Sequence, residues 1–336
     1  MAAVSVRDVA RRAGVSVGTV SNVMNHPDKV AATTVARVRA AIDELGFIRN
    51  DAARQLRDGR SKTIGLVVLD VRNPFFTDIA RGAEDAAALA GLAVTLGNSD
   101  ESTARESTYL DLFEQQRVHG ILISPYADIT PRLHALRARG IPVVLVDRTS
   151  PDASFSSVSV DDLAGGALAV DHLVERGRRR IAFVGGQFEI RQFADRLEGA
   201  RRAAARHPGV SLEVVEIAAS TVIEGRAAGS AIVARPPADR PDAVFAANDL
   251  VSMGVLQALL MQGADVRVPD EIALIGYDDI DFAAAAVVQL SSIRQPSALI
   301  GATAVQILLE EAADPAIEPR QVEFQPQLVV RASTGG

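Results

Sequence analysis

The first 46 residues place their apolar side chains with a helical period. In residues 5–25, one set recurs at the i, i+3, i+4, i+7 spacing that gives a helix a single apolar face: Val6, Val9, Ala10 and Ala13. Val20 and Val23 would turn a second short helix toward the first, which leaves four positions outward: Val17, Gly18, Ser21 and Asn22. The pattern therefore predicts two packed amphipathic helices.

The residues between these helices predict a tight turn. Ser5 followed by Asp8 resembles a capping box at the start of the first helix. Gly14 supplies the permissive backbone that ends this helix, and Ser16 can cap the next one. Two helices joined by a short Gly-containing turn form the helix-turn-helix pattern, whose second helix lies in the DNA major groove. An ordinary helical hairpin has the same pattern, so the two interpretations stay open here.

A third helix and a linker follow. Apolar positions from Val35 to Leu45 predict the helix, and Gly46 ends it. Residues 1–46 would thus form a small three-helix headpiece. Residues 47–62 form a hinge segment in which a short helix, capped by Asn50, gives way to a Gly- and Ser-containing linker. Leu56 lies among arginines there, and few apolar residues nearby could bury its side chain.

From Thr63 onward, continuous apolar runs alternate with helical segments. Eight runs stand out: TIGLVVLD, LAVTLGNSD, HGILISP, IPVVLVDR, SSVSVDD, RRIAFVGG, DAVFAAND and EIALIGYDD. Runs that are apolar on both faces are typical of parallel sheets in α/β domains, which bind ligands at the carboxyl edge of the strands. We therefore predict two doubly wound lobes in residues 63–336. Lobe 1 is expected at 63–161 with 293–325, and lobe 2 at 162–292.

Charge separates the headpiece from the core. Residues 1–62 carry a balance of +5, although the whole chain has a net charge of −7. A basic segment attached to an acidic core is the charge distribution expected of a protein that binds the phosphates of DNA. DNA binding therefore becomes the leading hypothesis. The chain contains no cysteine, no signal peptide and no apolar stretch of membrane-spanning length. We expect a cytoplasmic protein without membrane contact.

An enzyme on an α/β core is the alternative of a different class. The acidic residues Asp147, Asp278, Asp279 and Asp281 could serve as acid–base or metal-binding groups. However, no nucleophile elbow, His-rich metal motif, phosphate loop or dinucleotide fingerprint is present in the sequence. We therefore expect no enzymatic activity, no cofactor and no metal.

Motifs along the whole chain resemble those of the lactose-repressor (LacI) family. They are VRDVARRAGVSVGTVSNVMN, ELGFIRNDAARQLR, NPFF, VDR, RLEG, AND, GYDDID and IRQP, in the expected order from Val6 to Pro296. The resemblance implies a DNA headpiece, a hinge helix and a core similar to periplasmic sugar-binding proteins. It also implies a homodimer, because two headpieces on a pseudo-palindromic operator require two-fold symmetry.

The resemblance assigns the DNA contacts. Val17, Gly18 and Asn22 would face base edges, of which only Asn22 can hydrogen-bond a base. Phosphate contacts would come from Ser16, Thr19, Ser21 and Asn25, and for Thr19 and Ser21 plain capping and solvation stay open as the alternative. In the hinge, Leu56 would wedge into the minor groove. Asn50, Ala53 and Arg54 would lie against that groove or its backbone.

The resemblance also implies a pocket like that of ribose-binding proteins. The implied effector-binding residues are Asn73, Phe75, Phe76, Asp147, Arg148, Arg196, Asn248, Asp278 and Gln295. The aromatic rings would stack on a sugar, the carboxylates would accept hydroxyl protons, and the arginines would neutralise the carboxylates. Simpler roles stay open: an Asp147–Arg148 ion pair, Asn73 as a helix cap, and Phe75 as a core residue.

The second lobe departs from this pattern in one respect. A further aromatic residue is expected between residues 218 and 231, where only Val222 and Ile223 are large. The effector predicted is ribose or another pentose, with a deoxy-hexose, a hexose or a purine as alternatives. The tail has no leucine heptad for a tetramerising bundle, which favours a dimer.

Overall fold

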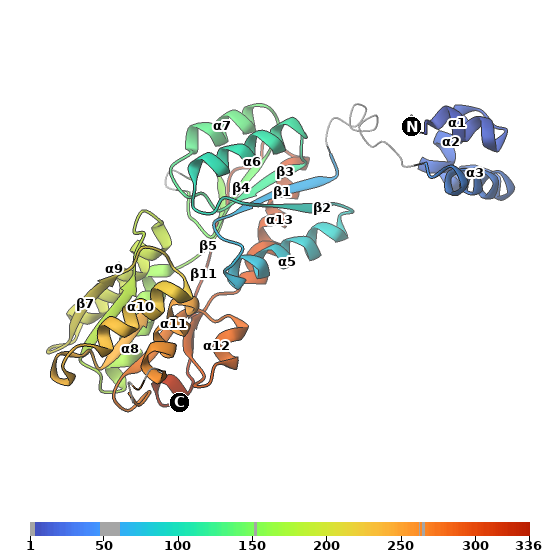
Figure 1. Cartoon of the computed structure of the whole chain (residues 1–336). Coiled ribbons are helices and arrows are strands. Elements are labelled where there is room, and N and C mark those ends of the chain that lie inside the picture. The colour runs from blue at the N-terminus through green and yellow to red at the C-terminus, as the bar shows by residue number, and fades with distance from the viewer. Residues whose placement is uncertain (1–3, 48–60, 151–152, 262, 264–265) are drawn as a thin grey trace. The chain divides into compact units, whose positions relative to one another are not determined.

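The computed structural model describes residues 4–47, 61–150, 153–261, 263 and 266–336. The chain forms two compact units, residues 1–60 and 61–336, which are described here one at a time (Figure 1). Four residues with predicted DNA contacts lie outside the described residues: Asn50, Ala53, Arg54 and Leu56.

The headpiece consists of three helices, α1 (Val6–Ala13), α2 (Val17–Asn25) and α3 (Ala32–Leu45), with a 3-10 turn at Pro27–Lys29. Asp8 accepts a hydrogen bond from the backbone N–H of Ser5 at 3.0 Å, which confirms the predicted capping box. Gly14 ends α1 at φ 61°, a left-handed conformation that favours glycine. Within residues 4–47, the buried apolar core is small: Val9, Ala10, Ala13, Val20, Val23, Val38 and Ala41.

Lobe 1 is built on a parallel six-stranded sheet in the order β11-β5-β4-β3-β1-β2. Its strands are β1 (Thr63–Val68), β2 (Ala93–Asn98), β3 (Gly120–Ile123), β4 (Val143–Val146), β5 (Ser156–Val160) and β11 (Gln321–Phe324). Helices α5 (Pro74–Leu89) and α13 (Ser297–Ala313) cover one face, and α6 (Thr103–Gln115) and α7 (Thr130–Ala138) the other (Figure 1). Each face buries its own apolar cluster, as a sheet buried on both sides requires.

Lobe 2 repeats this plan with the strand order β12-β10-β9-β8-β6-β7, in which only β12 is antiparallel. Its strands are β6 (Arg180–Gly185), β7 (Ser211–Glu216), β8 (Ala243–Ala246), β9 (Ala273–Asp278), β10 (Ser291–Arg294) and β12 (Gln327–Val329). Its helices are α8 (Asp162–Glu175), α9 (Arg191–Arg206), α10 (Val222–Val233), α11 (Asp249–Leu260) and α12 (Asp281–Ala285), with 3-10 turns at Pro237–Asp239 and Ala332–Thr334. The predicted fold class, a helix-turn-helix headpiece on a two-lobed α/β core, is confirmed.

The boundaries between the lobes differ from the prediction in one place. Lobe 1 was expected to resume at residue 293, but β10 pairs in parallel with β9 and buries Ile293 in the core of lobe 2. The chain returns to lobe 1 only after β10, and it crosses back after β11 to add β12 to lobe 2. With the crossing between β5 and α8, three segments connect the lobes. Within the part of the chain that the structure describes, no helix has the length and apolarity to span a membrane.

Candidate functional site

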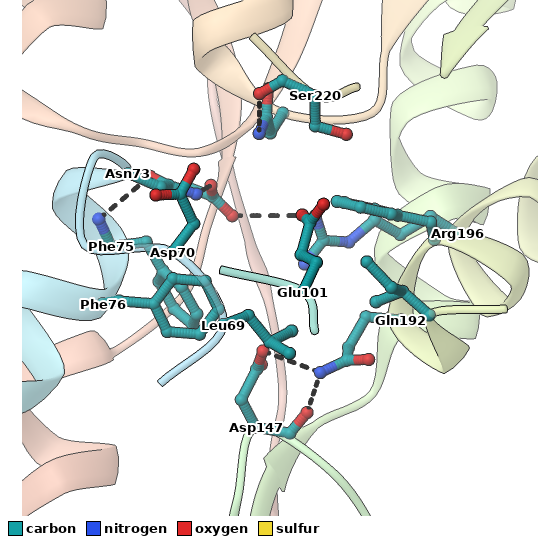
Figure 2. Close-up of a pocket in the computed structure, with 14 residues that line it drawn as sticks. Leu69, Asp70, Asn73, Phe75, Phe76, Glu101, Asp147, Gln192, Arg196 and Ser220 are labelled. Atoms are coloured by element: carbon teal, nitrogen blue, oxygen red, sulfur yellow. Dashed lines mark hydrogen bonds and ion pairs between the residues drawn. The ribbon is translucent and has the colours of Figure 1, made fainter. Parts of the chain in front are cut away.

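A pocket lies between the two lobes, where strand ends and the loops after them meet. The empty space within it, part of which is open to solvent, is about 440 Å³. Its lining residues are Leu69, Asp70, Asn73, Phe75, Phe76, Glu101, Asp147, Ile190, Gln192, Phe193, Arg196, Ser220, Asn248 and Asp278. Figure 2 shows Phe76 and Arg196 approaching the pocket from opposite sides. Seven of the nine residues predicted to bind the effector are brought together here.

Asn73 joins the two lobes at the start of α5. Its side-chain oxygen accepts from the backbone N–H of Phe75 at 3.1 Å, which makes it the helix cap. Its amide group donates to Oδ2 of Asp278 at 2.9 Å, across the cleft. Because one amide fixes both the first turn of the helix and the carboxylate, capping and a place in the pocket are compatible.

Phe75 and Phe76 follow in the first turn of α5 and form the apolar wall. Their ring centroids are 5.1 Å apart with an interplanar angle of 65°, an edge-to-face arrangement. Both side chains are buried and pack in the core of lobe 1 as well as lining the pocket. The interpretation of Phe75 as a core residue is thus compatible with its place at the pocket.

Arg196 organises the polar wall of lobe 2. Its Nε donates to Asp162 at 2.8 Å, one terminal nitrogen donates to the carbonyl of Ala247 at 2.9 Å, and the same nitrogen lies 3.7 Å from Asp278. Its guanidinium carbon lies 3.7 Å from the ring centroid of Tyr277, within cation–π range. Arg196 is only 3% exposed, and these buried partners hold its rigid fork beside the pocket.

Burial shifts the titration of this cluster. It raises the pKa of Asp278 above the ordinary carboxyl value, although Arg196 and hydrogen bonds from Asn73 and Gln295 oppose that shift. The pKa values of Asp147 and Asp162 are also raised by burial, with Arg196 lowering both. Burial alone would lower the pKa of Arg196, but the neighbouring carboxylate of Asp162 and other acidic groups raise it. Arg196 therefore stays positively charged, and the carboxyl groups of Asp147, Asp162 and Asp278 share this single positive charge.

Asp147 follows β4 in a left-handed conformation, φ 57°, that turns its carboxylate toward lobe 2. Oδ2 accepts a hydrogen bond from the amide of Gln192 at 2.8 Å, and the same amide donates to the backbone carbonyl of Asp147. Oδ1 is buried and has no hydrogen-bond partner among the described residues. A buried carboxylate oxygen without a donor is costly, so this atom marks a place for a hydrogen-bond donor from a ligand.

Two predicted residues do not line the pocket. Arg148 turns away from Asp147, donates to the carbonyl of Pro125 at 3.1 Å, and lines a neighbouring cavity instead. The predicted neutralisation of Asp147 by Arg148 is therefore wrong for this conformation, because adjacent residues after a strand point in different directions. Gln295 lies behind Asp278 and donates to its Oδ1 at 2.8 Å, so it supports a pocket residue without lining the pocket.

The pocket also contains residues that the sequence did not suggest. Gln192 and Phe193 line it from the start of α9, and Phe193 supplies an aromatic ring from lobe 2. This ring comes from a different segment than residues 218–231, where only Ser220 lines the pocket. Glu101 lines it from the loop after β2 and accepts a hydrogen bond from Gln187 of lobe 2. The one signal for Gln192 and Phe193 in the sequence is their position a few residues before Arg196, which was itself predicted to line the pocket.

The headpiece presents the predicted recognition helix. Val20 and Val23 are buried, whereas Val17 is 42% exposed and Gly18 and Asn22 are exposed, as predicted. Ser16 accepts from the backbone N–H of Thr19 at 3.1 Å. Asn25 donates to the hydroxyl of Ser21 at 3.2 Å. The capping interpretation therefore holds for Ser16, and its hydroxyl is also within 2.9 Å of the Thr19 hydroxyl.

Comparison with known proteins identifies the family. The model for bacterial regulatory proteins of the lacI family matches residues 5–50, and that for a periplasmic binding protein-like domain matches residues 170–334. The chain is 34% identical to the HTH-type transcriptional repressor PurR of Photobacterium profundum, over 98% of both chains. The chain belongs to the LacI family.

Two further comparisons support this membership. The LacI-family chain is 32% identical to the Ribose operon repressor of Escherichia coli (strain K12), over 98% of this chain and 99% of that repressor. Its structure matches that of the lac repressor dimer bound to operator and the anti-inducer ONPF with a TM-score of 0.83 and 27% identity, over 99% of both chains. The protein is thus a DNA-binding transcriptional repressor of this family and not an enzyme.

Proposed function

We propose that this LacI-family repressor binds a palindromic operator as a dimer and is gated by a small sugar, with ribose or another pentose as the effector. The observation that carries the proposal is the pocket itself. It places an aromatic wall of Phe75 and Phe76 opposite buried groups that accept and donate hydrogen bonds, Asp147, Arg196 and Asp278. Sugars need such a combination, because they present C–H faces together with vicinal hydroxyls.

The unpaired atoms in the pocket favour a ligand with hydroxyl groups. Among the described residues, Oδ1 of Asp147 and the hydroxyl of Ser220 line the pocket and are buried without a hydrogen-bond partner. The carboxylate oxygen accepts and the serine hydroxyl can accept or donate, so a ligand with several hydroxyl groups would satisfy both. A purine base offers fewer donors for its size, which makes it the less favoured effector. The relative named as a ribose operon repressor supports a pentose, whereas the relative named PurR keeps the purine as an alternative to be tested.

Gating would act through the bonds that already join the lobes. Asn73 reaches Asp278, Gln192 reaches Asp147, and Gln187 reaches Glu101, each across the cleft. A sugar that binds among these groups would replace part of this network and change how the lobes close about the three connecting segments, a hinge motion. By linkage, sugar and operator must then alter each other's affinity by the same factor.

The headpiece and the hinge would bind the operator DNA. Val17, Gly18 and Asn22 would face base edges, while Ser16, Thr19, Ser21 and Asn25 would contact phosphates. Leu56 would enter the minor groove, flanked by Asn50, Ala53 and Arg54. A protein of this kind works where the chromosome is, so we place it in the cytoplasm.

A ligand screen tests the effector. Thermal unfolding of the full chain is followed with D-ribose, D-xylose, L-fucose, D-glucose and hypoxanthine, and each ligand that stabilises the protein is checked by calorimetry. A ligand at 100 times its Kd stabilises by about 2.7 kcal/mol, an easily measured shift. We expect a pentose to give the largest shift. A shift with hypoxanthine alone would contradict the pentose, and no shift with any of the five would contradict the assignment of the pocket to this set of ligands.

A further inference from the structure

The C-terminal tail packs in lobe 2, next to residues that hold the effector pocket in place. After β12 the chain turns through Ala332–Thr334, and Ser333 and Thr334 are almost completely buried. The Thr334 hydroxyl lies 2.8 Å from Nε2 of His172 and 2.7 Å from the Ser291 hydroxyl. The Ser333 hydroxyl donates to the carbonyl of Leu274 at 2.6 Å. The tail is therefore anchored in lobe 2, and its position is fixed.

Arg331 extends from this anchored tail to Asp279, the residue after the pocket carboxylate. One terminal nitrogen of Arg331 lies 2.6 Å from Oδ1 of Asp279, an ion pair without hydrogen-bond geometry, and donates to the carbonyl of Leu290 at 2.7 Å. The other carboxylate oxygen of Asp279 accepts from Nε of Arg294 at 2.7 Å. The Asp279 side chain is only 4% exposed, so two arginines hold this buried carboxylate from two sides.

The backbone at this point has an unfavourable conformation. Asp278 has φ 101° and Asp279 has φ 58°, both in the region that residues with a Cβ atom rarely adopt. Such conformations persist only where surrounding contacts impose them. Here the backbone N–H of Asp279 donates to the Ser292 hydroxyl at 3.0 Å, and that of Ile280 donates to Asp249 at 3.0 Å. The ion pairs of Asp279 add a side-chain restraint to these backbone bonds.

We propose that Arg331 is a positioning residue for the effector pocket: by clamping Asp279 it holds the carboxylate of Asp278 against Asn73, Gln295 and Arg196. Without the clamp, the strained pair relaxes toward ordinary φ values, and the carboxylate of Asp278 rotates away from the pocket. The C-terminal tail therefore sets effector affinity although it does not line the pocket. This inference rests on the proposed function, because it assumes that the pocket takes a sugar.

Three full-length variants test the clamp by calorimetric titration with D-ribose, well below each unfolding transition. Arg331→Met removes the charge and keeps the apolar stem, and we expect affinity to fall about tenfold, as it does when outer partners of metal-binding residues are removed. Arg331→Lys keeps the charge and should stay within about threefold of the unaltered protein. Arg176→Met is the matched control, since Arg176 donates to the carbonyl of Gly335 at 3.0 Å but does not contact Asp279.

The outcomes separate the clamp from a general effect of the tail. Unchanged affinity in Arg331→Met would overturn the proposal, and so would an equal loss in Arg176→Met. Asp279→Asn tests the same contact from the other residue. In a double-mutant cycle, its effect on sugar affinity should not add to that of Arg331→Met. Additive losses would show that the two residues act separately.

Amide hydrogen exchange tests the clamp without any ligand. Arg331→Met should speed exchange at Asp279 and Ile280 relative to Arg176→Met, and equal exchange in the two variants would overturn the clamp. If the unaltered protein fails to bind D-ribose, the pentose assignment is contradicted, and the exchange experiment still decides the role of Arg331.

Discussion

The two lobes contribute to the pocket in different ways. In lobe 2, Arg196 donates to Asp162 and forms an ion pair with Asp278, and the ring of Tyr277 lies against the guanidinium. In lobe 1, the rings of Phe75 and Phe76 lie beside polar and acidic residues, and the side chains of Asn73 and Asp147 bond to lobe 2. The polar groups of lobe 2 are therefore preorganised by contacts within that lobe, whereas lobe 1 adds an aromatic pair and polar groups that bond across the cleft.

Replacing Arg196 should have the largest effect, because it dismantles the network of lobe 2. Arg196→Met leaves the buried carboxylates of Asp162 and Asp278 without their cation, which costs about 3–5 kcal/mol of unfolding free energy. We expect sugar binding to be lost as well. Urea denaturation and calorimetry measure the two effects.

The matched control on the same helix is Arg191→Met. Arg191 is paired with Asp195 at 2.7 Å, but its side chain is 66% exposed, so the unfolding free energy should change by less than about 1 kcal/mol. If Arg196→Met were as stable as this control and still bound sugar, the network of lobe 2 would not be preorganised for binding.

Replacing an aromatic ring in lobe 1 should have a smaller effect, confined mainly to binding. Phe76→Leu keeps most of the apolar volume but removes the flat ring face, and we expect sugar affinity to fall about tenfold, which corresponds to about 1.4 kcal/mol. The control is Phe113→Leu, since Phe113 is buried in the other apolar cluster of lobe 1. That variant should lose stability and retain sugar affinity. Equal affinities in the two variants would count against an aromatic wall.

The pH dependence of binding should show the smallest but most specific effect. Burial raises the pKa values of Asp147 and Asp278, so both become protonated at a higher pH than an ordinary aspartate, whose pKa is about 3.9. As pH falls, sugar affinity should decline before exposed carboxylates titrate, because a protonated carboxyl group is a poorer acceptor.

Unfolding does not explain this predicted loss. When the folded pKa of a carboxyl group is raised, the folded state takes up the proton at higher pH than the unfolded state, so these two groups add stability as pH falls through that value. Calorimetric titrations over a pH series measure the decline. Asp147→Asn should flatten the profile, and an unchanged profile in that variant would assign the titration to another group.

The sequence predicted the central strands well because they are buried on both faces. All eight apolar runs contain strands of the two sheets, but β2 is an edge strand with mostly exposed or half-buried side chains, so its apolar pattern and not its burial made it predictable. The strands outside these runs are the edge strands β7, β11 and β12, and β10, which lies next to an edge. β7 pairs only with β6 and leaves most of its side chains exposed or half-buried, so polar residues interrupt its pattern. β10 is short, and its pairing with β9 could not be inferred from local composition.

The pocket was predicted in part, for reasons that differ between residues. The resemblance to ribose-binding proteins named residues at strand ends or helix starts, such as Asn73 and Asp278, and these positions meet because the topology brings the carboxyl ends of the strands together. The direction of Arg148 and the place of Gln295 behind Asp278 depend on side-chain rotamers and on packing between lobes. Gln192 was not predicted because its contact with Asp147 joins residues 45 positions apart without any local pattern.

The central claim is that the sugar pocket controls operator binding, and the reciprocal coupling measures this most directly. A duplex that the full-length protein selects from random sequences is titrated by fluorescence anisotropy with and without saturating D-ribose. Sugar affinity is then measured with and without that duplex. We predict that the two affinities change by the same factor, on the order of 5- to 150-fold. Binding of both ligands with neither affecting the other would contradict the account.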